Sequence, residues 1–101
     1  MNVKLNVRSV NFDADQKLLD FIQEKINKLT QFFDQIIGAD VYLKVDNNHG
    51  LENKEVEIRL FIPGHDLFAK KVSKNFEAAT DEVTEALRRQ AKKRKEKARG
   101  I

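Results

Sequence analysis

The chain contains no cysteine among its 101 residues. This absence excludes disulfides, zinc–thiolate sites and thiol catalysis, and it is compatible with a reducing compartment. The N-terminal stretch MNVKLNVRSV has no apolar run long enough for a signal peptide, and no segment approaches the length of a membrane span. We therefore expect a cytoplasmic protein with no membrane partner.

Sequence signatures of catalysis and metal binding are also missing. The chain has no GxSxG motif and no glycine-rich phosphate loop, and its carboxylates are scattered over faces that should be solvated. The two histidines, His49 and His65, both fall in expected turns without a second ligand at helix or strand spacing. We expect no enzymatic activity, no metal, no cofactor and no small-molecule substrate.

Charge is abundant but unevenly distributed. Residues 1–87 hold 11 basic and 15 acidic side chains, a formal charge of −4, whereas residues 88–101 hold eight basic and one acidic, or +7. The basic cluster favours a polyanionic partner, because a phosphate backbone would relieve the repulsion between neighbouring cations and release counterions. The alternative is a solvated C-terminus. Few aromatic residues lie among the cations, so we expect phosphate and shape contacts rather than base readout.

Alternating apolar and polar residues predict strands in the first ten residues and around residues 41–46 and 55–62. Turn-forming residues at 46–50 predict a hairpin loop, and Pro63-Gly64 predicts a turn before a shorter strand at 65–73. The side chains expected to face the core are Val3, Leu5, Val7, Val41, Leu43, Val45, Val56, Ile58, Leu60 and Ile62.

Two amphipathic helices are expected. The first spans roughly 15–33, with Asp15 as N-cap and an apolar stripe of Leu18, Ile22, Ile26, Leu29 and Phe33. The second begins near Asn75, and its first half carries acids that suit the positive end of the helix dipole. Beyond Leu87 bulky apolar residues give way to cations, so this part should have little to pack against and should project past the sheet.

The resulting order is β-α-β-β-β-α, an α+β fold. Each strand has one apolar face, so a four-stranded sheet needs covering on one side, which the two helices can provide. We expect one domain over residues 1–101, similar to double-stranded-RNA-binding domains, with a basic helix end at 88–99.

Other surface residues could extend a phosphate-binding surface or be ordinary solvated side chains. The basic candidates are Lys4, Arg8, Lys25, Lys28, Lys70, Lys71 and Lys74. Phe61 and Tyr42 are expected on the polar faces of their strands, where they could contact a partner or simply be exposed.

The predicted element order and two segments, KINKLTQFFDQI (25–36) and NFEAATDEVTEALRRQAKKRKEK (75–97), resemble the ribosome hibernation promoting factors and the related ribosome-associated inhibitor A. Glu77 and Ala86 depart from the pattern, where many members have an aromatic residue and a lysine. Because the chain ends just after the expected second helix, the resemblance is to the short form of the family. The residues that match in register are Lys25, Lys28, Leu29, Asp34, Ala78, Ala79, Asp81, Leu87, Arg89, Gln90, Lys93, Lys95 and Lys97.

The resemblance implies binding to the small ribosomal subunit and its ribosomal RNA at the decoding region. The protein would then occupy the channel of mRNA and tRNA anticodon arms and inhibit translation during starvation or stationary phase. It would be monomeric off the ribosome. Matching family positions and the basic cluster together give the expected RNA contacts Lys25, Lys28, Arg88, Arg89, Lys92, Lys93, Lys95 and Lys97.

Two other classes of function remain open. One is a general structured-RNA-binding module or RNA chaperone that is not specific to ribosomes. The other is an interaction protein whose basic helix docks onto an acidic partner.

Overall fold

A computed structural model of the protein describes residues 4–10, 12–46 and 50–98 and, in the last helix, side chains only as far as Arg94. The expectations for Val3 and His49 lie outside these residues. Six elements follow one another in the predicted order: β1 (Lys4–Val10), α1 (Gln16–Phe32), β2 (Gly38–Val45), β3 (Lys54–Phe61), β4 (Leu67–Ser73) and α2 (Phe76–Ala98).

The four strands form one mixed sheet in the order β1-β2-β3-β4. The first pair is parallel, with Val7 opposite Val41, and the chain crosses between these strands through α1. The other two pairs are antiparallel, with Leu43 opposite Val56 and Ile58 opposite Ala69. Both edges of the sheet, β1 and β4, are therefore strands with one unpaired side.

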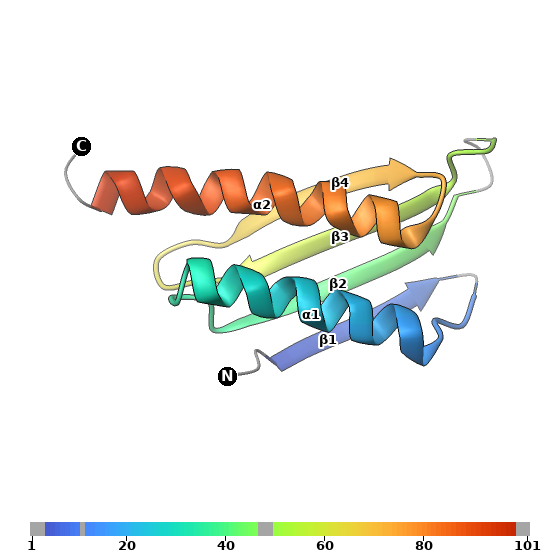
Figure 1. The fold of residues 1–101 in the computed structure, drawn as a ribbon, viewed down its shortest axis with the longest axis horizontal. Coiled ribbons are helices and arrows are strands. Elements are labelled where there is room, and N and C mark those ends of the chain that lie inside the picture. The colour runs from blue at the N-terminus through green and yellow to red at the C-terminus, as the bar shows by residue number, and fades with distance from the viewer. Residues whose placement is uncertain (1–3, 11, 47–49, 99–101) are drawn as a thin grey trace.

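Both helices lie on the same face of the sheet, as the one-sided strand pattern predicts (Figure 1). In the view of Figure 1, α1 lies in front of β1 and β2, and α2 lies along β3 and β4. One apolar core fills the space between the two layers, and its largest fully buried side chains include Ile22, Ile26, Leu43, Ile58, Leu60 and Leu87. The predicted inward residues Leu5, Val7 and Val45 are half-buried and pack against this core.

Side-chain caps fix where the helices begin. The Asp15 carboxylate accepts a hydrogen bond from the Leu18 amide at 2.9 Å, which confirms the predicted N-cap. The Asn75 side chain does the same for the Ala78 amide at 2.7 Å. Next to this cap the rings of Phe76 and Phe12 stack with centroids 4.6 Å apart, so the start of α2 is joined to the segment that precedes α1.

Candidate nucleic-acid interface

The exposed cations of α2 result from the way this helix packs on the sheet. Val83 and Leu87 are completely buried and Ala91 is 1% exposed, so one stripe of the helix faces the core. Residues on the opposite side must then face solvent, since successive side chains are about 100° apart around a helix. Three predicted RNA contacts, Arg89, Lys92 and Lys93, lie there, and a fourth, Arg88, lies on the flank of α2 that faces α1; all four are exposed.

The packing of α2 continues further than the sequence predicts. The expectation that little is left to pack beyond Leu87 is wrong, because the small side chain of Ala91 is buried and Gln90 and Arg94 hydrogen-bond to the backbone of β4 and of the β3–β4 turn. A search for bulky apolar residues overlooks this type of contact. Only the last turns of α2 extend past the β3–β4 turn (Figure 1). Lys95 and Lys97 belong to these turns, and their side chains lie outside the described residues.

Two of the basic residues of α1, Lys25 and Lys28, line the groove between the helices. Lys28 and Arg88 line one pocket there, together with Phe32. The Arg88 guanidinium lies 5.1 Å from the centre of the Phe32 ring, a cation–π contact that restricts the arginine without neutralising it. The fold therefore brings a cation of α1 and a cation of α2 to one surface, although they are 60 positions apart in the chain.

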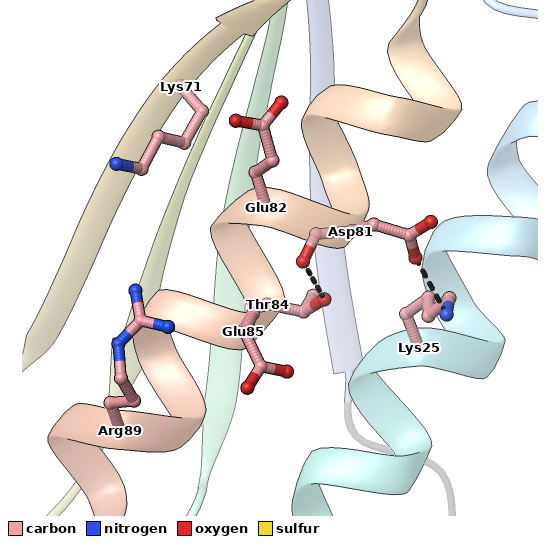
Figure 2. Close-up of a pocket in the computed structure, with 7 residues that line it drawn as sticks. All are labelled: Lys25, Lys71, Asp81, Glu82, Thr84, Glu85 and Arg89. Atoms are coloured by element: carbon pink, nitrogen blue, oxygen red, sulfur yellow. Dashed lines mark hydrogen bonds and ion pairs between the residues drawn. The ribbon is translucent and has the colours of Figure 1, made fainter.

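A neighbouring pocket mixes both signs of charge. Its lining includes Lys25 from α1, Lys71 from β4, and Asp81, Glu82 and Arg89 from α2. Figure 2 shows Lys25 and Asp81 pointing toward one another, and their charged atoms are 2.7 Å apart. On the other side of α2 in this view, Lys71, Glu82 and Arg89 extend from two elements. Lys25 therefore already has an acidic neighbour. Arg89 lies where the acidic half of α2, residues 76–87, meets its basic half, residues 88–98.

The lysines of β4 do not act as one group. Lys71 lies opposite the buried Val56 and lines the pocket that contains Arg89, so it belongs to the helix side of the sheet. Lys70 lies opposite Glu57 on the uncovered side. Sequence reasoning treats these neighbours together, but successive side chains of a strand point to opposite faces.

On the uncovered face of the sheet, cations of β2, β3 and β4 lie opposite acids. Across its rows, Arg59 lies opposite Asp40, Lys44 opposite Glu55, and Lys70 opposite Glu57, which is the arrangement that stabilises paired strands.

Aromatic rings on this face already have cationic neighbours. The guanidinium of Arg8 lies 6.0 Å from the ring centre of Tyr42, and that of Arg59 lies 5.3 Å from that of Phe68. Tyr42 is exposed, as predicted, and Phe61 is half-buried rather than exposed. Phe68, which the sequence did not single out, is 42% exposed. The uncovered face offers no excess of positive charge comparable to that of α2.

Other kinds of site are not found in the part of the chain that the structure describes. No group of three or more histidine or acidic side chains within residues 4–10, 12–46 and 50–98 could hold a metal ion. His65 is an exposed turn residue. Over the same ranges, no helix combines the length and the apolar character required to cross a membrane.

Comparison with solved structures identifies the same fold elsewhere. The chain superimposes on a ribosomal subunit interface protein from Coxiella burnetii with a TM-score of 0.82 and 18% identity, covering 92% of this chain and 98% of that one. The N-terminal domain of Protein Y from Thermus thermophilus gives a TM-score of 0.75 and 22% identity with the same coverage. At these identities the likeness establishes the fold alone.

Comparison with characterised sequences gives closer relatives. A ribosome hibernation promoting factor from Pseudomonas putida is 32% identical over 99 residues, which are 98% of this chain and 93% of the relative. Its namesake from Escherichia coli is 30% identical over 95 residues, 94% of this chain and 96% of the relative. The Bacillus subtilis ribosome hibernation promotion factor is 33% identical over 94 residues, and the match covers only 48% of that protein.

A family model matches nearly the whole chain. Residues 5–99 match the model of the family described as Sigma 54 modulation protein / S30EA ribosomal protein, so the match includes every strand and both helices almost entirely. The resemblance seen in the two helical segments is thereby confirmed over the whole fold. The chain belongs to the Sigma 54 modulation protein / S30EA ribosomal protein family.

Proposed function

We propose that this protein is a cytoplasmic ribosome hibernation factor that binds the small ribosomal subunit through the basic part of α2. On this proposal it occupies the decoding region and the mRNA channel and inhibits translation during starvation or stationary phase. The names of the relatives from Pseudomonas putida and Escherichia coli support hibernation as the process. The protein itself acts as a binding partner of ribosomal RNA, without catalysis.

One observation about this chain carries the proposal. Three cations, Arg89, Lys92 and Lys93, are exposed on the side of α2 that faces away from the sheet, and Arg88 and Lys28 join them at the groove between the helices. A helix that presents such a row can follow a phosphate backbone, and the contacts gain free energy from counterion release. Lys25, Lys95 and Lys97 complete the proposed contacts, with Lys25 contributing less because Asp81 is its neighbour.

The test is the salt dependence of binding to purified small ribosomal subunits. With about five or six phosphates neutralised, the slope of log affinity against log salt should be roughly −4 to −5. Replacing Arg89, Lys92 and Lys93 together by alanine should weaken binding and make the slope shallower by about two to three units. Fold stability should hardly change, since all three side chains are exposed.

A matched control removes the same charge from elsewhere. Lys4, Lys44 and Lys70 are exposed on the uncovered face, so their replacement by alanine lowers the net charge equally without touching α2. Equal loss of binding in both triple variants would show that only overall charge matters, and the proposed site would be wrong. Loss of binding in competition with excess duplex RNA would favour a general RNA-binding module instead.

A further inference from the structure

Gln90 completes the edge of the sheet with its side chain. Its amide nitrogen donates to the Phe68 carbonyl at 2.8 Å, and its carbonyl oxygen accepts from the Phe68 amide at 3.3 Å. Phe68 belongs to β4, the edge strand, where such backbone groups otherwise face solvent. The carboxamide has the same donor and acceptor as a peptide group. Gln90 therefore pairs with Phe68 as a residue of a neighbouring strand would.

Arg94 makes a second polar contact one helical turn later. Its guanidinium donates to the Pro63 carbonyl at 2.8 Å, in the turn between β3 and β4. Gly64 follows with a φ of 94°, a conformation that glycine adopts without steric cost. A Cβ atom added at Gly64 would lie 2.9 Å from the Arg94 guanidinium, so the glycine also gives this side chain its space.

The two contacts flank Ala91, which is 1% exposed. A small side chain at this position lets the helix backbone approach the sheet closely enough for Gln90 and Arg94 to reach the main chain. The second half of α2 is thus attached by hydrogen bonds, where its first half is attached by large apolar side chains. Arg94 continues the buried stripe seven positions after Leu87, which separates it from the solvent-facing cations.

We propose that Gln90 and Arg94 are positioning residues that hold the basic half of α2 in the orientation in which it meets RNA phosphates. This inference rests on the proposed function. Cations three and four positions apart repel one another and favour fraying of the helix. Two hydrogen bonds to fixed backbone groups oppose that fraying before RNA arrives, so binding loses less conformational freedom. Arg94 therefore acts through its neighbours and is not counted among the phosphate contacts.

The test uses a variant that removes the Gln90 contact, disturbs the Arg94 contact and keeps every charge. Gln90→Met preserves the length of the side chain without its donor and acceptor. Gly64→Ala places a Cβ atom 2.9 Å from the Arg94 guanidinium, which must then shift from the position in which it donates to Pro63. A matched control combines Gln35→Met with Gly50→Ala. Gly50 also has positive φ, at 63°, but an added Cβ there meets nothing within 4 Å, so the control carries an alanine at a positive-φ position without a steric clash.

Hydrogen exchange and subunit binding give two independent readouts. In the Gln90→Met/Gly64→Ala variant, the Phe68 amide and the amides of residues 88–94 should lose protection from hydrogen exchange. If a tenth of the helices remain correctly placed, affinity for purified small subunits should fall about tenfold. The salt slope should stay unchanged, because the same cations still neutralise phosphates. The control variant should match the wild type in both readouts.

The possible failures are distinguishable. If exchange protection is lost while affinity stays at the wild-type value, or if protection is retained, the positioning role is wrong and the proposed function is unaffected. A salt slope that becomes shallower would also overturn it, since Arg94 would then be a phosphate contact. If instead the Arg89, Lys92 and Lys93 triple variant binds like the wild type, the proposed function fails, and the exchange data still decide whether the two residues hold the helix.

Discussion

The two halves of α2 are one continuous helix, yet they are built on different principles. Residues 76–87 bury Phe76, Val83 and Leu87 in the core and carry four acids and no base. Residues 88–98 bury only Ala91 among the side chains described, and their solvent side is cationic. The first half stabilises the fold by burying apolar side chains, and the second half, which continues the same helix, presents the cations. Separating the two roles lets a strongly repulsive surface exist on an otherwise ordinary small domain.

Truncating the last large core residue of α2 should have the largest effect. Leu87 is completely buried, so Leu87→Ala should lower the free energy of unfolding by about 2–5 kcal/mol. Lys92→Ala, on the exposed side of the second half, should leave stability within about 0.5 kcal/mol of the wild type. Chemical denaturation of both variants measures the contrast. Similar losses in the two variants would show that the halves do not differ as described.

A larger side chain at Ala91, near the boundary between the two halves of α2, tests how far along the helix the core extends. Ala91 has almost no exposed surface, so Ala91→Leu should force the helix away from the sheet and destabilise the protein by about 1–3 kcal/mol. It should also weaken subunit binding, because Gln90 and Arg94 would move with the backbone. Ala86→Leu is a control on the same helix at a half-buried position. An Ala91→Leu variant as stable as the wild type would mean that packing ends at Leu87.

Neutralising the acids next to the basic half of α2 should strengthen binding to the small subunit. Glu82 and Glu85 line the pocket that contains Arg89, so their potential reduces the attraction of phosphates there. Glu82→Gln with Glu85→Gln should tighten subunit binding about two- to fivefold at low salt, and less at high salt, since exposed charges are screened. The same change at Asp13 and Glu52, replaced by Asn and Gln, removes equal charge from exposed residues outside the pockets that contain Arg88 and Arg89 and should have a smaller effect.

Most of the fold was predictable because its signals are local. Strand alternation predicted the burial of Leu43 and Ile58, and the spacing of four from Leu18 to Ile26 predicted the inner face of α1. The sign and place of the basic surface also follow from the sequence. Gln90 and Phe68 could not be paired in this way, because a polar side chain reveals its partner only once β4 and α2 lie side by side. Arg94 did carry a signal, its position on the buried stripe, which its charge obscured.

The smallest effect is expected at the ion pair that joins the helices. Lys25 and Asp81 are 2.7 Å apart, but their side chains are 32% and 53% exposed, so Asp81→Asn should cost at most about 1 kcal/mol of stability. The substitution also removes the acidic partner of the Lys25 ion pair (Figure 2). If Lys25 contacts phosphate, Lys25→Ala should weaken subunit binding more in the Asp81→Asn background than in the wild type.

Glu24→Gln provides the comparison for this last prediction. Glu24 lies 3.9 Å from Lys28, and both side chains are about two-thirds exposed, so solvent already screens that pair more strongly. Removing the acidic partner of Lys28 by Glu24→Gln should therefore change subunit binding less than removing that of Lys25 by Asp81→Asn. A double-mutant cycle on each pair measures the difference directly. If Lys25→Ala has the same effect in both backgrounds, Lys25 serves the contact between the helices, and the RNA surface begins at Lys28 and Arg88.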